Sequence, residues 1–138
     1  GLRVDAAYAT DGRAVLPASL PDDVAEAAVL VHTGWSRRRG TEAYWVPGPY
    51  LSRALVDRLI EGRAALVGFD GWNVDDTADL ARPVHTRLLE AGILIVEHLT
   101  RLDELPPHGF RFTAVPPPIR GAASFPVRAF AEIETVPA

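Results

Sequence analysis

The sequence of 138 residues contains no cysteine. Disulfides, thiol nucleophiles and cysteine-based zinc sites are therefore excluded, and any metal site must be built from histidine, aspartate and glutamate. The lack of cysteine also fits a reducing compartment. No apolar run approaches the ~20 residues that span a bilayer, and the N-terminus lacks a basic start followed by an apolar segment. We therefore expect a cytoplasmic protein that does not enter a membrane.

Methionine is absent as well, even from the first position. The chain opens on "GLRVDAAY", which looks like a strand already under way. We therefore expect that the native protein starts upstream, and that residues 1–138 form one domain that is incomplete at its N-terminus.

The chain also has no large excess of positive or negative charge, with a net charge of −4. This mild charge does not favour a nucleic-acid partner. The one basic run, Arg37–Arg39, lies between Gly34 and Gly40, and we interpret it as a solvated loop rather than a phosphate or RNA site. With 48% hydrophobic and 23% charged residues, the composition is that of a globular domain with a core.

The middle of the chain alternates between aliphatic strands and helices. The segments "AVLVHTGW", "AALVGFD" and "ILIVEHL" predict buried strands that end in turns. A helix is predicted over residues 51–62, with Leu51, Leu55, Val56 and Leu59 on one face and Gly62 at its end. A second helix is expected to begin near Pro83 and to end before a turn at Gly92. This β-α-β-α-β order is typical of a parallel sheet covered by helices.

Both ends of the chain predict antiparallel structure. Residues 1–7 and 13–17 are predicted to form a hairpin around a turn at Asp11 and Gly12, followed by a short helix over residues 19–28. Residues 110–115 and 125–136 alternate between apolar and polar side chains. The predicted fold class is α/β, with three layers that comprise a central, mostly parallel sheet, a second antiparallel sheet and a layer of helices.

The ends of the three buried strands carry groups that can bind a ligand. In parallel sheets, ligands gather outside the carboxyl ends of the strands. These ends are Thr33-Gly34-Trp35, then Asp70, then Glu97-His98. Strands commonly end in polar residues, but three such ends together favour a pocket at this edge.

His85 and Glu97 are the candidate metal ligands. His85 is expected on the same buried face as its i+3 and i+4 neighbours, Leu88 and Leu89. Because Pro83 places His85 at a helix start, His85 and Glu97 are both predicted at the same rim of the sheet. One imidazole and one carboxylate suit zinc, manganese or iron(II), although catalytic zinc generally takes three protein ligands. The alternative for His85 is a hydrogen-bonded core histidine.

The other histidines carry weaker signals. We interpret His32 as a core residue, His98 as a supporting partner of Glu97 or a residue without a role, and His108 as exposed. The sequence has no Gly-x-Ser-x-Gly elbow, phosphate loop or dinucleotide-binding motif, which removes several classes of enzyme.

Four segments resemble the cyclase family, which contains bacterial kynurenine formamidase and related metal-dependent amide hydrolases. They are "VLVHTGW", "PYLSRALVDRLIEGRAALVGFD", "RPVHTRLLEAGILIVEHLTRLDELP" and "FPVRAFA", in the family's order and rough spacing. The resemblance implies a swivelling β/β/α fold, homodimers or larger oligomers, and divalent metal, often zinc, that activates water for attack on an amide or lactam. It also implies that His85 and Glu97 match a ligand pair, and that Trp35 matches a feature near the pocket.

The family's His-x-Gly-Thr-His-x-Asp-x-Pro segment, which supplies further ligands, is not in this sequence. Our first hypothesis is the C-terminal portion of a metal-dependent hydrolase that acts on N-formylkynurenine or a cyclic amide, with zinc or manganese as cofactor. Trp35 and Asp70 are predicted to bind the substrate, and no catalytic acid or base is assigned. An aromatic pocket that includes Tyr44, Trp45 and Trp72 would suit an aryl amide. The second hypothesis is a non-catalytic binding or structural domain that kept the fold and lost the metal.

Overall fold

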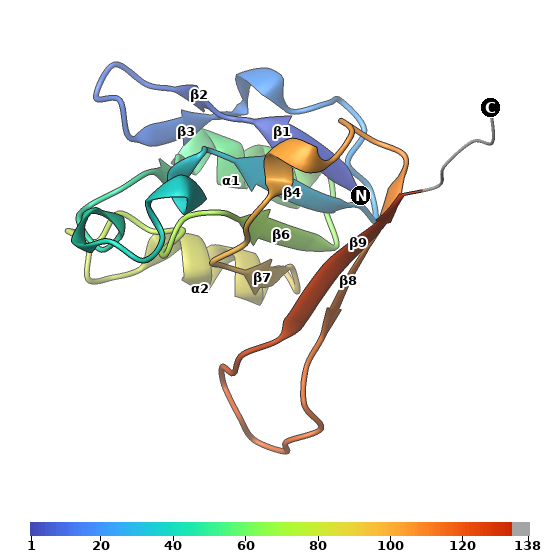
Figure 1. Ribbon diagram of the computed structural model, residues 1–138. Helices are drawn as coiled ribbons and strands as arrows, with labels where there is room; N and C mark the ends of the chain where they lie inside the picture. Colours follow the sequence, from blue (N-terminus) through green and yellow to red (C-terminus); the bar gives the residue numbers. More distant parts are fainter. Residues whose placement is uncertain (134–138) are drawn as a thin grey trace.

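A four-stranded parallel sheet forms the centre of the molecule. The structure, a computed structural model, describes residues 1–133 of the chain (Figure 1). The strands lie in the order β1-β4-β6-β7, and all neighbours are parallel. Their bounds are β1 Leu2–Asp5, β4 Ala28–His32, β6 Leu66–Phe69 and β7 Leu94–Val96. The predicted β-α-β-α-β core is thus confirmed, and β1 extends it.

The inner strand β4 is buried on both of its faces, and successive side chains of a strand point to opposite faces. Along β4, Val29 and Val31 belong to the larger core on the helical side, whereas Leu30 belongs to a second core on the other side. All three side chains are fully buried. A strand covered on both faces has no wet side, which explains the unbroken aliphatic run in its sequence.

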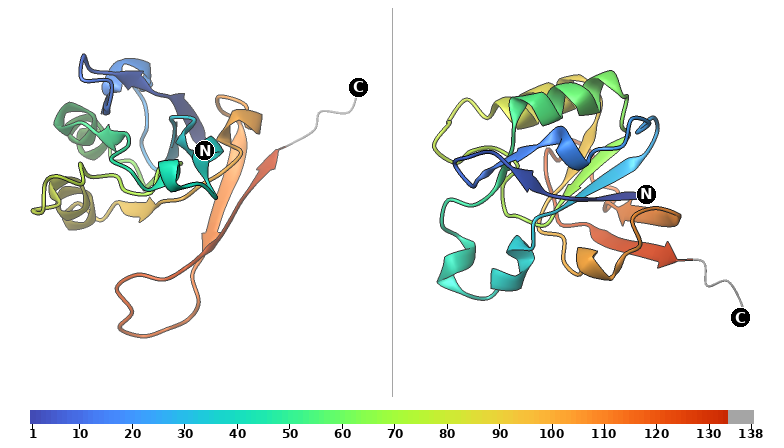
Figure 2. Two further views of the ribbon diagram at one scale, coloured as in Figure 1. Left: turned by 60° about the vertical axis from the view of Figure 1, so that its left-hand side comes forward. Right: turned by 90° about the horizontal axis from the view of Figure 1, so that it is seen from above.

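Helices α1 (Arg53–Glu61) and α2 (Pro83–Glu90) cover one face of the sheet (Figure 2). The side chain of Ser52 caps α1, because its oxygen accepts a hydrogen bond from the amide of Leu55 at 3.2 Å. In α2, Leu88 is fully buried but Leu89 is 54% exposed. The expectation that both leucines face the core is therefore wrong, because this two-turn helix contacts the core along the narrow stripe of Val84 and Leu88.

A small sheet lies beside the helical layer and consists of β2 (Ala7–Tyr8), β3 (Ala14–Leu16) and β5 (Tyr50–Leu51). The predicted hairpin is present, but its first strand is β2, since β1 pairs with β4 instead. Gly12 turns the chain with a φ of +70°.

The helix predicted over residues 19–28 is wrong. A 3-10 turn, η1 (Pro17–Ser19), is followed by irregular chain. Here the carboxylate of Asp23 accepts a hydrogen bond from the amide of Ala25, a local turn that competes with helix formation.

A two-stranded antiparallel hairpin, β8 (Phe110–Val115) and β9 (Arg128–Ile133), covers the opposite face of the sheet and extends beyond it (Figures 1 and 2). The predicted alternation is confirmed for Ala129 and Ala131, which pack against the second core, and for Phe130, which is exposed. Ile133, expected on the same face as the two alanines, is exposed as well. The expected end of this strand, at residues 134–136, lies outside the described residues. The three-layer α/β fold is confirmed, with two small sheets where one was predicted.

Three short 3-10 helices complete the described elements: η2 (Trp35–Arg38), η3 (Glu42–Tyr44) and η4 (Leu102–Glu104). Within residues 1–133, no helix has both the length and the apolar character needed to cross a membrane.

Candidate metal site at the carboxyl edge of the sheet

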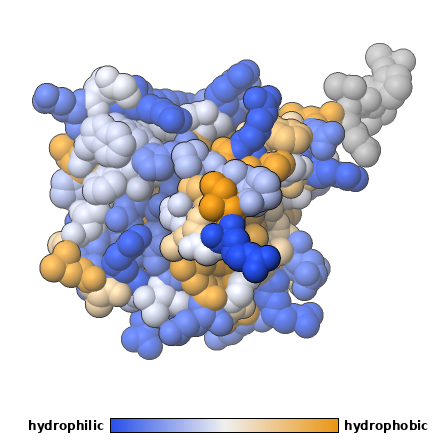
Figure 3. Space-filling model, turned by 90° about the horizontal axis from the view of Figure 1, so that it is seen from below, coloured by the Kyte–Doolittle hydropathy of each residue, from blue (hydrophilic) through white to orange (hydrophobic). Residues whose placement is uncertain are grey.

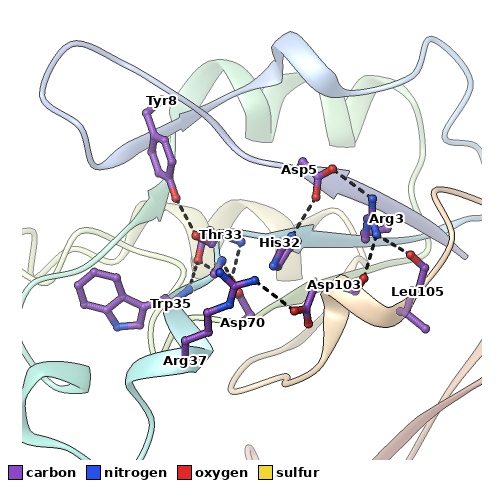
Figure 4. Close-up of polar contacts among 11 residues, drawn as sticks. Arg3, Asp5, Tyr8, His32, Thr33, Trp35, Arg37, Asp70, Asp103 and Leu105 are labelled. Carbon is purple, nitrogen blue, oxygen red and sulfur yellow. Dashed lines mark hydrogen bonds and ion pairs between the residues drawn. The ribbon is translucent and has the colours of Figure 1, made fainter.

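Asp70 joins the ends of two neighbouring strands (Figure 4). It follows β6 directly and is fully buried. One carboxylate oxygen accepts hydrogen bonds from the amide of Thr33 at 2.9 Å and its hydroxyl at 2.5 Å. The other accepts from the amide of Gly34 at 2.8 Å. The strand ends therefore meet as predicted, and the substrate-binding role of Asp70 stays a prediction because its described partners are backbone and side-chain groups of the loop after β4.

Trp35 organises the loop that follows β4. Its indole nitrogen donates a hydrogen bond to the carbonyl oxygen of Tyr44 at 2.9 Å, and the guanidinium of Arg38 lies 4.1 Å from the ring centroid. A Cβ atom at Gly48 would come within 2.8 Å of the indole, so this glycine permits the close approach of the ring. The predicted role of Trp35 in substrate binding also stays a prediction.

The structure brings His85 and Glu97 together. His85 lies in the first turn of α2 and Glu97 directly follows β7. The imidazole Nε2 atom of His85 lies 3.6 Å from the Oε1 atom of Glu97. Their side chains are 17% and 22% exposed, so the pair lies at the rim of the sheet and in reach of solvent.

Asp75, which the sequence analysis missed, holds His85 from the opposite side of the ring. Its carboxylate is buried and lies 2.6 Å from the Nδ1 atom of His85. The same carboxylate accepts hydrogen bonds from the backbone amides of Val84 at 2.6 Å and His85 at 3.3 Å. It thereby caps α2 from a distant loop, because Arg82 at the N-cap position offers no side-chain cap. The motif Asp-Asp at positions 75 and 76 gave no signal, since the contact depends on the tertiary fold.

Arg82 lies over the accessible side of His85. Its guanidinium is 3.1 Å from Nε2 and 3.2 Å from Nδ1 of the ring. The side chain of Arg82 is 57% exposed and its backbone is left-handed, with a φ of +49°. Since Nδ1 is already paired with Asp75, the contact of Arg82 with Nε2 is the one that a ligand at this nitrogen would replace.

An aromatic cluster lies next to Glu97. The Nδ1 atom of His98 is 2.8 Å from the phenol oxygen of Tyr44. The ring of Trp45 lies 5.9 Å from that of His98 and 6.0 Å from that of Trp72. Burial raises the pKa of Tyr44 above its ordinary value, which keeps the phenol protonated. His98 has a φ of +61°, a conformation that is costly for a residue with a side chain and that clusters at functional sites.

A groove of about 1200 Å³ opens beside this cluster, between β7, η4 and the β8–β9 hairpin. Tyr44, Trp45, Glu97 and His98 all contribute to its wall. Glu97 therefore contacts His85 on one side and the groove on the other. Figure 3 shows the molecule from below, where hydrophobic residues gather right of the centre of a surface that is otherwise largely polar.

Two predictions about the other histidines have different outcomes. The prediction that His32 is a core residue is wrong, because it is partly exposed and its Nδ1 atom lies 2.9 Å from the carboxylate of Asp5 (Figure 4). Strand β4 ends at His32. His108 is exposed, as predicted.

The donor atoms of His85 and Glu97 fit one divalent ion. Two ligands that each bond to the same tetrahedral ion at about 2.1 Å lie about 3.4 Å apart, close to the observed 3.6 Å. Within residues 1–133, no group of three or more histidine, aspartate or glutamate side chains is arranged to hold a metal. Asp75 does not complete such a group, since it contacts the other nitrogen of the ring. This pair is fewer than the three protein ligands that a catalytic zinc generally takes.

A parallel sheet between a helical layer and an antiparallel hairpin, with a histidine–glutamate pair at its carboxyl edge, defines a three-layer α/β protein with a candidate metal site. The chain belongs to the cyclase family, because the family described as "Putative cyclase" matches residues 7–76. The match includes Thr33 and Asp70 and ends before His85.

Relatives with an assigned name point the same way. The chain is 33% identical over 101 residues to kynurenine formamidase from Geobacillus thermodenitrificans strain NG80-2, covering 73% of this chain and 47% of the relative. It is 31% identical over 85 residues to kynurenine formamidase from Polaromonas naphthalenivorans strain CJ2, covering 62% of this chain and 38% of the relative. The chain thus spans about half or less of the length of these curated relatives.

Solved structures confirm the swivelling β/β/α fold. Isatin hydrolase A from Ralstonia solanacearum superimposes with a TM-score of 0.81 and 26% identity, over 96% of this chain and 60% of that protein. A protein described as a potential metal-dependent hydrolase with cyclase activity superimposes with a TM-score of 0.74 and 21% identity, over 93% of this chain and 61% of that protein, which supports the fold alone.

Proposed function

We propose that this chain is the part of a metal-dependent amide hydrolase that supplies His85 and Glu97 to a divalent metal. The observation that carries the proposal is the 3.6 Å separation between the Nε2 atom of His85 and the Oε1 atom of Glu97 at the rim of the sheet. Membership of a family with relatives named kynurenine formamidase supports an amide as the bond that is cleaved.

Four side chains of the chain would take part in binding the metal. A divalent metal supplies a Lewis acid that lowers the pKa of water to about 7. His85 and Glu97 would hold this ion, and zinc or manganese both accept such ligands. The guanidinium of Arg82 would swing away from Nε2, which its exposure allows. Nδ1 of His85 would stay bonded to Asp75, which leaves Nε2 as the free donor atom.

The proposed substrate is an aryl amide or a cyclic aryl amide. The ring of Trp45 is 60% exposed beside His98 and Trp72, so it offers an apolar face close to Glu97. Aromatic rings stack favourably on such faces. Relatives named kynurenine formamidase and isatin hydrolase support this class. Trp35 and Asp70 would act on the substrate through the loop that they hold in place.

Metal binding by the chain tests the proposal directly. Isothermal titration with zinc and with manganese is expected to show one site per chain, which His85→Ala and Glu97→Gln each weaken by at least tenfold. His108→Ala, which removes an exposed histidine outside the site, is the matched control and should leave binding unchanged. Equal binding by all four proteins would overturn the assignment of the metal ligands.

Hydrolysis tests the reaction. The protein in its natural full length is expected to cleave N-formylkynurenine or isatin, to lose this activity in the presence of a chelator, and to regain it when zinc or manganese is added back. Activity that is indifferent to the chelator contradicts the proposal. A protein that binds no metal and cleaves neither compound would favour the non-catalytic alternative, which no comparison favours.

Three further expectations belong to the same proposal. They are a small-molecule amide rather than a nucleic acid as partner, a homo-oligomeric assembly, and a cytoplasmic location. Exposed apolar side chains of the β8–β9 hairpin, among them Val115, Phe130 and Ile133, support the assembly. Light scattering of the purified protein at several concentrations would measure it.

A further inference from the structure

We propose that Asp75 is a positioning residue that sets the orientation and tautomer of His85, so that the Nε2 lone pair faces Glu97. This inference rests on the proposed function, because it concerns how His85 is prepared to bind a metal. Asp75 and Asp70 are the buried carboxylates of residues 1–133. Asp70 joins two strand ends, whereas Asp75 lies against the imidazole itself.

The two oxygens of Asp75 face a set of hydrogen-bond donors. Oδ1 lies 2.6 Å from the backbone nitrogen of Val84. Oδ2 lies 2.6 Å from Nδ1 of His85 and 3.3 Å from the backbone nitrogen of the same residue. An ionised carboxylate only accepts hydrogen bonds, so Nδ1 must carry the proton in this contact. In the neutral ring, Nε2 is then unprotonated and free to bind a metal.

The helix and the ring are held by one group. The amides of Val84 and His85 belong to the first turn of α2, where backbone N–H groups have no hydrogen-bond acceptor within the helix. Because the same carboxylate binds these amides and the ring, the position of the backbone and the rotation of the imidazole are fixed together. Asp75 is 2% exposed, so water does not compete for these hydrogen bonds.

Val74, the residue before Asp75, connects the same loop to Glu97. The backbone nitrogen of Val74 donates a hydrogen bond to Oε1 of Glu97 at 2.8 Å. One short loop therefore holds both candidate ligands, His85 through the side chain of Asp75 and Glu97 through the amide of Val74. This arrangement accounts for the 3.6 Å separation between the two donor atoms.

Asp75→Asn is a sharp test because asparagine has only one acceptor oxygen. The amide of Val84 and Nδ1 of His85 contact different oxygens of Asp75, and the single carbonyl oxygen of asparagine can occupy only one of these two positions. If the oxygen keeps the amide of Val84, the NH₂ group faces Nδ1 and favours the tautomer with the proton on Nε2. That tautomer has no lone pair for a metal at Nε2.

The experiment uses the metal-free chain and the two matched variants Asp75→Asn and Asp76→Asn. Asp76 is the adjacent carboxylate and pairs with Arg13, so it controls for the loss of one negative charge. Nitrogen-15 NMR of the imidazoles, recorded at alkaline pH, reports which ring nitrogen carries the proton. The signals of His85 are assigned by their loss in His85→Ala. The wild type and Asp76→Asn are expected to carry it on Nδ1, and Asp75→Asn on Nε2.

Zinc titration supplies the second measurement. Loss of such a partner of a metal-binding histidine typically lowers affinity about 10- to 100-fold, and we expect this loss for Asp75→Asn and none for Asp76→Asn. A protonated Nε2 in the wild type overturns the proposal, even if Asp75→Asn does not fold. So does unchanged zinc affinity in a folded Asp75→Asn protein.

The two proposals fail in different ways. If the wild type binds no zinc but Asp75→Asn shifts the proton to Nε2, the proposed function fails and Asp75 still positions the ring. If the wild type binds zinc through His85 and Glu97 but Asp75→Asn alters neither the tautomer nor the affinity, the function stands and the positioning role is refuted.

Discussion

At the scale of single residues, the carboxylates of Asp70 and Asp75 each join segments of the chain that are not adjacent in the sequence. The partners of Asp70 lie 36 and 37 residues away and those of Asp75 lie 9 and 10 residues away. Buried carboxylates are costly unless hydrogen bonds compensate the loss of water. Both have several such bonds, which makes their removal expensive.

Asp70→Ala is expected to lower the free energy of unfolding by roughly 3 kcal/mol or more, because it leaves the amides of Thr33 and Gly34 without their acceptor in a buried site. Urea unfolding followed by circular dichroism measures the change. Asp103→Ala is the control, since its ion pair with Arg37 lies in solvent, and should cost much less. Equal losses in the two variants would contradict the anchoring role of Asp70.

Some residues of the candidate site could be predicted from the sequence. His85, Glu97 and Asp70 were recognisable because each interrupts or ends an aliphatic pattern. Asp75 was not, because a carboxylate in a loop rich in polar residues looks like a solvated one. Its burial follows only from the packing of that loop against α2 and the end of β7.

At the scale of elements, the ends of α2 agree with the sequence-based prediction, whereas its buried face does not. Pro83 and Gly92 marked its limits correctly, since proline favours a first turn and Gly92 adopts a φ of +76°. Leu88 and Leu89 follow each other in sequence and point about 100° apart on a helix. Only contact with the core decides which of them is buried.

Leu88→Ala and Leu89→Ala form a matched pair on this helix. Leu88 is fully buried, so its truncation should cost about 2–5 kcal/mol of unfolding free energy. Leu89 is 54% exposed, so its truncation should cost no more than about 0.5 kcal/mol. Thermal and urea unfolding measure both values. Similar losses at the two positions would show that α2 is rotated about its axis relative to this structure.

At residues 19–28, residue types that favour the start of a helix predicted a helix that does not form. Pro21 and the two aspartates after it are typical of a first helical turn, yet the chain there is irregular. Val24 is buried in the main core, and Glu26 has a φ of +56°, which no helix tolerates. Anchoring of Val24 and the local turn at Asp23 outweigh a weak helical preference.

At the scale of the whole molecule, ion pairs join segments that are far apart in the sequence, and they make stability depend on pH. The guanidinium of Arg13, in the turn between β2 and β3, hydrogen-bonds the carboxylate of Asp76 at 2.7 Å. This contact lowers the pKa of Asp76 below its ordinary value of 3.8. A hydrogen bond from His32 lowers the pKa of Asp5 in the same direction.

A carboxylate with a lowered folded pKa stabilises the protein above the pKa of the unfolded chain, and this contribution is lost as the pH falls through the folded pKa. Asp76→Asn should therefore cost less than about 1 kcal/mol near pH 7, and this cost should vanish at pH values below the folded pKa. Urea midpoints measured between about pH 7 and about pH 2.5 follow the change. In an Arg13→Gln background the effect of Asp76→Asn should be much smaller, and a cost that does not vary with pH would refute the sign.

The sequence by itself determined the parallel β-α-β-α-β core, the ends of α2 and the polar groups at the strand ends. These features follow from local patterns, because burial on both faces requires aliphatic runs and helix ends require particular residues. The tertiary structure decided that β1 joins the parallel sheet, that Leu88 rather than Leu89 faces the core, and that Asp75 holds His85. Each of these features depends on which segments of the chain meet in the folded protein. Such contacts do not produce a periodic pattern in the sequence, so the sequence alone does not predict them.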